Sequence, residues 1–282
     1  MRYSLSLGHL VPERVVPVAR TAERCGFDGV SMSDHVVDLV EVASQYPYGG
    51  RSTTSAPRPR LDPWVTAGLV VAATERLTFM TSVYVLTLRH PLLTAKAAAT
   101  VARASGGRLI LGLGQGWLRE EFESLGVPFE RRGKRFDEAL SIARLMWSHE
   151  RVAHDGACYR FPSLISSPRP EAPIPLYVGG HSLAMQERAA RWGDGWICPP
   201  VPTVITDQIA TVRRLRAQHG RSETPFEFVA MCDDPSPALI SQLAGAGISH
   251  VNVSPPWRRA GAGDEIACVE SLADRLGLAA AS

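Results

Sequence analysis

Cysteine is scarce in this chain, and its placement excludes two kinds of structural site. The five cysteines are dispersed, and no pair forms a C-x-x-C motif: they are Cys25, Cys158, Cys198, Cys232 and Cys268. An odd, dispersed set predicts neither a disulfide framework nor a zinc site. We therefore expect all five to be buried as small hydrophobic side chains, as in proteins of a reducing compartment.

Long apolar runs and a strong charge of one sign are missing as well. No stretch of about 18 apolar residues occurs, so no membrane-spanning helix is predicted. The segment after Met1 lacks the apolar core of a signal peptide, which favours a cytoplasmic location. The 30 basic and 28 acidic residues leave a net charge of +2, too small to predict binding to nucleic acid or to a membrane surface.

The sequence does contain a regular alternation of short apolar strands with amphipathic helices. The predicted strands lie at residues 3–7, 29–33, 77–83, 108–114, 175–180, 195–198, 226–231 and 250–254. Each is followed by a segment with apolar residues at helical spacing. About eight such units in ~250 residues, with no linker between them, predict an α/β fold, a TIM-like (β/α)8 barrel forming a single domain over residues 1–282.

Two stretches interrupt this alternation. Residues 36–61 follow the second strand and are rich in Gly, Pro, Ser and Arg, which is typical of a lid or binding loop. Residues 151–175 contain an Asp155-Gly156 hairpin signal and precede the fifth strand. Because active sites of TIM barrels lie where strands end, we expect the first stretch at the site and the second to start at the opposite face.

The same rule selects the residues that follow each strand as candidates for the active site. They are His9, Asp34, His35, Ser82, Val83, Tyr84, Gln115, Trp117, Gly179, Gly180, His181, Ser182, Cys198, Asp233, Asp234, Ser254 and Trp257. The rule uses no motif, so it predicts proximity and leaves the chemistry open.

Residues 112–117, GLGQGW, look like a nucleotide-binding loop but do not match one. The dinucleotide motif is G-x-G-x-x-G near the start of a βαβ unit, whereas Gly112, Gly114 and Gly116 form G-x-G-x-G further along the chain. Alternate glycines at a strand end predict a flat backbone surface that a planar ring can approach.

Residues 179–182, GGHS, are the stronger candidate for a phosphate site. Gly179 and Gly180 end a strand, and Ser182 can cap the following helix, whose free N–H groups would face an anion. A plain glycine turn with a serine cap fits the same residues, and the sequence does not separate the two interpretations.

Asp34 and His35 are the best candidates for proton transfer. An acidic residue next to a histidine at a barrel mouth suits chemistry near neutral pH, and a direct or cofactor-contact role is expected. No H-x-H or H-E-x-x-H spacing is present, so no metal site is predicted. Residues 89–91 can be an anion contact or the start of a helix with Pro91 in its first turn, and we favour the helix start. Glu120 and Glu121 are expected on a surface turn.

Three stretches together resemble one family. ARTAERCGFDGVSMSDH, RHPLLTAKAAATVARASGGRLILGLGQGWLREEFESLGVPFERRGKRFDEAL and PIPLYVGGHSLAMQERAARWGDGW are similar to the luciferase-like flavin and deazaflavin oxidoreductases, in particular the branch that uses coenzyme F420. The resemblance covers residues 1–195. It implies a TIM-like barrel, a cofactor ring near Asp34 and His35, and a non-proline cis peptide at Ser82–Val83.

The resemblance also implies a function and a set of partners. The cofactor would be F420, with FMN as the alternative, and its phosphate would lie at Gly179, Gly180, His181 and Ser182. Ser82, Val83 and Gly114 would contact the ring, and the pocket for a small-molecule substrate would contain His9, Trp117, Tyr46 and Tyr48. Arg51, Arg58 and Arg60 either meet the anionic cofactor tail or are solvated. A homodimer is expected.

One difference from related enzymes narrows the class of substrate that we expect. Sugar-phosphate dehydrogenases of this superfamily carry a glutamate after the G-x-G-x-G run and a tryptophan after the Asp-His pair, where this chain has Trp117 and Val36-Val37. A sugar phosphate is therefore not expected. The alternatives to an F420-dependent hydride transfer are an FMN-dependent monooxygenase, a non-catalytic flavin-binding protein and a metal-dependent sugar isomerase.

Overall fold

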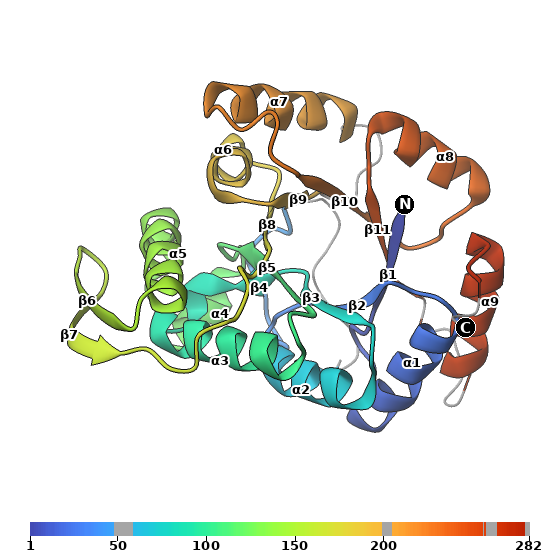
Figure 1. The fold of residues 1–282 in the computed structure, drawn as a ribbon, viewed down its shortest axis with the longest axis horizontal. Helices are drawn as coiled ribbons and strands as arrows, with labels where there is room; N and C mark the ends of the chain where they lie inside the picture. Colours follow the sequence, from blue (N-terminus) through green and yellow to red (C-terminus); the bar gives the residue numbers. More distant parts are fainter. Residues whose placement is uncertain (48–58, 199–204, 256, 258–263, 280–282) are drawn as a thin grey trace.

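The chain forms a closed barrel of parallel strands with helices on its outside (Figure 1). The computed structural model describes residues 1–47, 59–198, 205–255, 257 and 264–279. Around the barrel the strands follow the order β3-β2-β1-β11-β10-β9-β8-β5, and β3 also pairs with β5, which closes the ring. All of these pairs are parallel. The predicted TIM-like (β/α)8 barrel is confirmed.

Each barrel strand overlaps a strand predicted from the sequence. The strands are β1 (Arg2–Ser6), β2 (Gly29–Met32), β3 (Thr78–Thr81), β5 (Leu109–Gly114), β8 (Leu176–Gly179), β9 (Gly195–Ile197), β10 (Glu227–Cys232) and β11 (His250–Val253). The third predicted strand, residues 77–83, ends in a break: β3 stops at Thr81, and β4 (Tyr84–Val85) begins beyond the predicted strand and pairs separately with β5. Ser82 and Val83 lie at the break, and the peptide between them is cis, as the family resemblance implied.

The helices pack on the outside of the barrel, and several begin at residues that cap them. They are α1 (Pro12–Arg24), α2 (Pro63–Ala73), α3 (Pro91–Ala104), α4 (Arg119–Ser124), α5 (Arg132–Ser148), α6 (Leu183–Trp192), α7 (Ile205–Gln218), α8 (Pro237–Ala246) and α9 (Glu265–Leu276), with a 3-10 turn η1 (Leu86–Leu88). The Asp62 side chain accepts hydrogen bonds from Trp64 N and Val65 N, which satisfies free donors at the start of α2. His90 and Ser182 do the same for α3 and α6.

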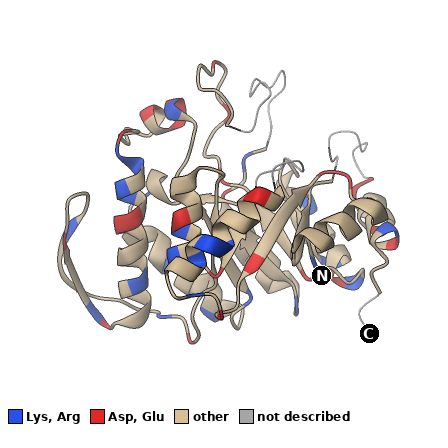
Figure 2. Cartoon of the chain, turned by 90° about the horizontal axis from the view of Figure 1, so that it is seen from above, with Lys and Arg blue, Asp and Glu red and all other residues tan. Residues whose placement is uncertain are grey.

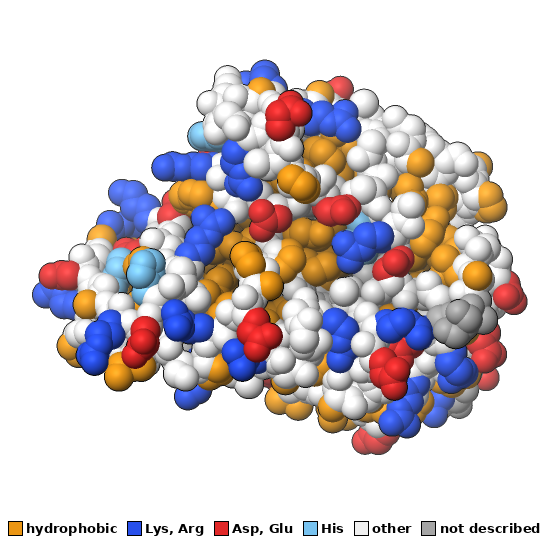
Figure 3. Space-filling view, in the orientation of Figure 1, with side chains coloured by type: hydrophobic (Ala, Val, Ile, Leu, Met, Phe, Trp, Pro, Cys, Tyr) orange, Lys and Arg blue, Asp and Glu red, His pale blue; other side chains and the backbone are white. Residues whose placement is uncertain are grey.

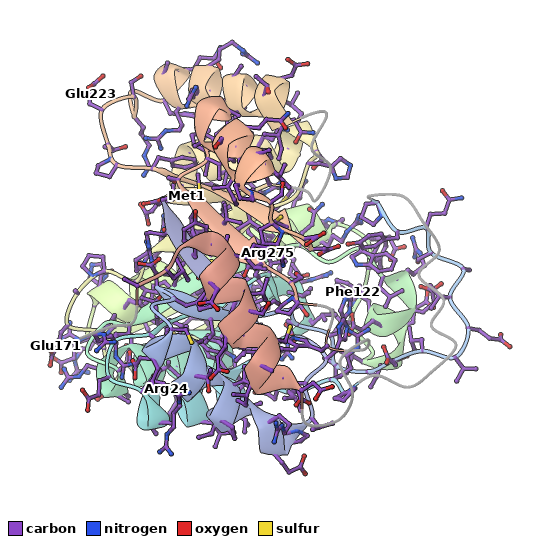
Figure 4. All side chains as sticks on the ribbon, turned by 90° about the vertical axis from the view of Figure 1, so that its right-hand side faces the viewer. Met1, Arg24, Phe122, Glu171, Glu223 and Arg275 are labelled. Atoms are coloured by element: carbon purple, nitrogen blue, oxygen red, sulfur yellow. The ribbon has the colours of Figure 1, made fainter. Side chains whose placement is uncertain are left out.

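The second interruption of the sequence forms an antiparallel hairpin, β6 (Arg151–Asp155) and β7 (Arg160–Ile165), as predicted. The hairpin projects from the barrel beside α5 (Figure 1). Figure 4 shows Glu171, which precedes β8, and Phe122 of α4, which follows β5, on opposite sides of the molecule. The end of this segment, just before β8, therefore lies on the side of the molecule opposite α4.

Two apolar layers hold the fold together. The larger one lies between the barrel and the helices, and β10 contributes Phe228 and Ala230 to it. The smaller one fills the barrel with side chains from several strands, among them Met80, Ile110 and Val229. Successive residues of β10 enter different layers because side chains alternate across a strand.

Polar side chains also fill part of the barrel. Ser4 Oγ lies 2.8 Å from His250 Nε2, and Ser31 Oγ donates to Asn252 Oδ1 at 2.8 Å. All four residues are buried. Burial, helped by the charge of Arg2, lowers the pKa of His250 to about 3, so this histidine is neutral in the folded protein.

The expectation that all five cysteines are buried is wrong for three of them. Cys198 and Cys232, at the ends of barrel strands, are buried, whereas Cys25, Cys158 and Cys268 are partly exposed and all five are free thiols. Of the three partly exposed ones, Cys25 directly follows α1, Cys158 lies in the β6–β7 turn and Cys268 lies in α9. Basic and acidic residues are interspersed along the chain in Figure 2, and the face seen in Figure 3 has no broad region of one sign.

Candidate active site

A cavity of about 760 Å³ lies where the barrel strands end. Thirteen residues were expected to take part in proton transfer or to contact the cofactor or the substrate, and twelve of them line the cavity: His9, Asp34, His35, Tyr46, Ser82, Val83, Gly114, Trp117, Gly179, Gly180, His181 and Ser182. The thirteenth, Tyr48, and the predicted tail contacts Arg51 and Arg58 lie outside the described residues. The C-terminal ends of the strands converge because all of them run in the same direction around the barrel.

The space beside the glycines of β5 and β8 is occupied by neighbouring protein atoms, so these glycines do not form a bare backbone surface. A Cβ atom at Gly114 would lie 2.5 Å from Val83 Cγ2, and one at Gly179 would lie 2.5 Å from Val83 Cγ1. At Gly112 it would meet Thr81 O. The predicted flat glycine surface is therefore wrong: the isopropyl group of Val83 covers Gly114 and Gly179, and Val83 itself faces the cavity.

Asp34 anchors the break between β3 and β4. Its backbone N–H donates to Val83 O at 3.2 Å, and its Oδ2 accepts from Val85 N at 2.9 Å. Arg89 donates from Nη1 at 2.6 Å and from Nη2 at 2.9 Å, one bond to each carboxylate oxygen. The side chain of Asp34 is fully buried. Burial raises the pKa of Asp34, and the guanidinium of Arg89 and the Val85 N–H act against that rise.

The residues after Arg89 begin a helix, as predicted. His90 accepts a hydrogen bond from Leu92 N, and Pro91 is the first residue of α3. Arg89 itself does more than precede the helix, because its guanidinium pairs with Asp34 and lies 4.8 Å from the centre of the Tyr84 ring. Tyr84, predicted at the active face, is buried against Trp64 of α2 instead.

His35 belongs to a cluster that the sequence did not reveal. Its Nδ1 lies 3.2 Å from Glu121 Oε2, and Glu121 Oε1 accepts from Val36 N at 2.6 Å. The ring of Trp117 packs edge-on against His35, with centroids 6.3 Å apart, and against Tyr46, with centroids 5.2 Å apart. The expectation of a surface turn is wrong for Glu121, whose side chain is 2% exposed.

Glu120 holds the far part of the same loop. Its Oε1 accepts from Ala43 N at 2.7 Å and from Ser44 N at 2.8 Å. Partial burial raises the pKa of Glu120, but hydrogen bonds from Ser44 and from the backbone outweigh it and lower the pKa to about 2. Two consecutive carboxylates of α4 thus fasten the loop that follows β2, and this loop brings Tyr46 into the cavity.

The start of α6 also lines the cavity. Ser182 accepts from Met185 N at 3.4 Å, so the predicted serine cap is confirmed, while the phosphate role stays a prediction. Gly180 has a φ of 126°, a region that favours glycine, and its carbonyl accepts from Trp196 Nε1 at 3.0 Å. The turn is thereby fixed with the α6 N-terminus beside the cavity.

Several lining residues escaped the sequence argument. They are Ser6, Gly8, Ser33, Pro47, Val85, Arg132, Met185, Ile197, Met231 and Pro255. Arg132 is the most informative: its Nε donates to Gly116 O at 3.0 Å, and its guanidinium lies 3.9 Å from the centre of the Phe129 ring. Proximity to the end of a strand could have found Ser6 and Ser33, but Arg132 begins α5 and had no such signal.

The structure also shows where the remaining candidate residues from the sequence lie. Gln115, Cys198, Asp233, Ser254 and Trp257 line the cavity as predicted. Asp234 pairs with Arg275 of α9 at the surface, and Arg60 pairs with Asp38. Among the described residues, no three His, Cys, Asp or Glu side chains are grouped as metal ligands. No helix in that part of the chain has the length and apolar character to cross a membrane.

Comparison with known proteins places the chain in a family. The model of the luciferase-like monooxygenase family matches residues 4–233, so the chain belongs to this family. An uncharacterized protein of Mycobacterium tuberculosis is 35% identical over 243 residues, which cover 84% of this chain and 83% of that protein. The F420-dependent glucose-6-phosphate dehydrogenase of Beutenbergia cavernae is 35% identical over 200 residues, covering 70% of this chain and 55% of that enzyme.

Solved structures confirm the architecture. The monooxygenase RslO1 from Streptomyces bottropensis superposes with a TM-score of 0.78 over 98% of each chain, at 19% sequence identity. At this identity the likeness shows the fold alone. The family and the fold agree with the resemblance found in the sequence.

Proposed function

We propose that this protein is an oxidoreductase that binds coenzyme F420 in the cavity and transfers a hydride between it and a small organic substrate. One observation carries the proposal: a single cavity joins an apolar wall of Val83, Ile197 and Met231 to the N-terminus of α6 and to Arg132. A tricyclic ring with a phosphate-bearing chain has this division into an apolar and an anionic part. The F420-dependent relative supports the choice of cofactor.

The described residues fit such a group. Val83 and Met231 offer apolar contact to a ring, and the cavity volume falls in the range of ordinary ligand sites. Ser182 and His181 at the start of α6, together with Arg132, offer N–H donors and positive charge to a phosphate.

Different residues of the cavity have different roles in the proposed reaction. Bound F420 would supply a ring carbon that gives or takes a hydride. His35 holds the proton that enters or leaves the substrate, and Asp34 supports the backbone beneath the ring through Val85 N and Arg89. Trp117 and Tyr46 close the substrate side and exclude water, so catalysis consists mainly of positioning.

The substrate proposed here is not a sugar phosphate. The relative from Beutenbergia cavernae acts on glucose 6-phosphate according to its name, but this chain has Trp117 directly after the glycine run. The ring of Trp117 meets Tyr46 and His35. These contacts form an aromatic wall, which suits a less polar substrate and leaves His9 as a further polar contact.

The cofactor is tested by titrating the purified protein with oxidised F420 and, separately, with FMN while following fluorescence. We expect F420 to bind about tenfold more tightly than FMN, a difference of ~1.4 kcal/mol. Arg132→Gln should weaken F420 binding. If the protein binds FMN tightly and does not bind F420, and if reduced FMN on the protein consumes oxygen, the protein is an FMN-dependent monooxygenase instead. If it binds a cofactor but turns over no substrate, it is a non-catalytic flavin-binding protein.

We propose further that two copies of the chain associate through α2. This helix carries no charged residue, yet Val65 and Leu69 on its outer face are 65% and 43% exposed. The helix α3 lies beside α2 (Figure 1). Its Leu93 is 66% exposed. A helix that is apolar on all sides is normally covered. Light scattering should give a dimer for the wild type and a monomer for V65E/L69E; a monomeric wild type contradicts the proposal.

A further inference from the structure

Glu121 is a buried carboxylate whose two oxygens have separate partners. Oε1 accepts from the backbone N–H of Val36 at 2.6 Å, and Oε2 lies 3.2 Å from Nδ1 of His35. The side chain of Glu121 is 2% exposed and that of His35 is 21% exposed. A short helix that follows β5 thus reaches the loop that follows β2 and touches the histidine of the candidate site.

This contact determines which nitrogen of His35 carries a proton. A carboxylate only accepts hydrogen bonds, so Nδ1 must be the donor. In neutral His35 the other nitrogen, Nε2, then carries the lone pair. The edge-on contact with Trp117, at an interplanar angle of 82°, restrains the plane of the ring, and His35 lines the cavity. Nε2 is therefore the nitrogen of His35 that can exchange a proton with a bound molecule.

We propose that Glu121 is a positioning residue that fixes the Nδ1–H tautomer of His35, so that His35 takes up and releases protons through Nε2. The proposal deepens the proposed function, because it says how the proton group of that site is oriented. The tautomer itself depends on no cofactor. It can therefore be tested on the protein alone.

A purely structural role for Glu121 is the competing explanation, since Val36 N–H also needs its acceptor. Glu121→Gln separates the two. The amide oxygen of glutamine can still accept from Val36 N, while its NH2 group would donate to Nδ1 and reverse the hydrogen bond. Glu123→Gln is the matched control, because Glu123 lies on the same helix, is 61% exposed and pairs only loosely with Arg119, at 4.0 Å.

The first measurement is NMR of protein with 13C,15N-labelled histidine, in which His35→Gln identifies the His35 signals. We expect the Nδ1–H tautomer in the wild type and in E123Q, and the Nε2–H tautomer in E121Q. The Nε2–H tautomer in the wild type, or an unchanged tautomer in E121Q, refutes the proposal. Reduced folding of E121Q would appear in the remaining histidine signals, and Glu121→Asp, which keeps the carboxylate, should then restore them together with the Nδ1–H tautomer.

The second measurement is turnover with F420 and a substrate identified by screening. E121Q should lower kcat by about 10²-fold, the contribution typical of a general acid or base. KM and the affinity for F420 should change less than about twofold, and E123Q should match the wild type. Equal kcat in E121Q and the wild type overturns the role in the reaction. Failure of the wild type to bind F420, with the expected tautomers present, refutes the cofactor and leaves the positioning of His35 intact.

Discussion

Replacing Asp34 by asparagine should destabilise the protein strongly, because it leaves a charge of Arg89 without its partner. The change preserves the shape of the side chain and an acceptor for Val85 N, but it removes the charge that faces both guanidinium nitrogens. Breaking a buried pair costs about 3–5 kcal/mol. The side chain of Arg89 is 21% exposed, so we expect about 3 kcal/mol, the lower end of this range.

The chain contains a control with the same contact distance and different burial. Arg275 donates to Asp234 at 2.6 Å, as Arg89 Nη1 does to Asp34, but these side chains are 42% and 84% exposed. Asp234→Asn should therefore cost at most about 1 kcal/mol. Urea unfolding followed by circular dichroism measures both variants. Equal losses for the two, or a loss below about 1 kcal/mol for D34N, would show that burial does not set the energy of this pair.

Three further outcomes follow from the packing and the titrating groups. Gly179→Ala should cost about 1–3 kcal/mol in urea unfolding, because its Cβ would lie 2.5 Å from Val83 Cγ1, whereas Gly68→Ala, with no atom within 4 Å, should be neutral or stabilising. His250 has a folded pKa of about 3 against 6.5 when unfolded, so the unfolded state binds more protons between these two pH values. The free energy of unfolding should therefore fall as the pH decreases below 6.5, by up to about 1.4 kcal/mol per pH unit. The variant His250→Gln should remove this slope, and a slope that persists in the variant would count against His250 as its cause. Ser182→Ala should lose about 1 kcal/mol of thermal stability with the cap on Met185 N, and unchanged stability would mean that the cap contributes nothing.

Local patterns were enough to predict the fold and the position of the site. Short apolar strands alternate with helices, which requires a parallel sheet, and about eight evenly spread units favour its closure into a barrel over an open sheet. The Asp62 and Ser182 caps and the Asp155-Gly156 hairpin depend on neighbours within a few residues, which the sequence displays. The rule that sites lie where strands end selected seventeen residues without any contact information, and fifteen of them line the cavity.

The contacts inside the site depend on the closed barrel. Glu121 meets His35 across 86 positions of sequence, and Arg89 meets Asp34 across 55. These pairs form because closure brings the loops after β2, β4 and β5 together at one rim, and no local pattern encodes which side chains then touch. The glycines illustrate the difference: their spacing could be read from the sequence, but that Val83 fills the space beside Gly114 and Gly179 was decided by how the strands register around the ring.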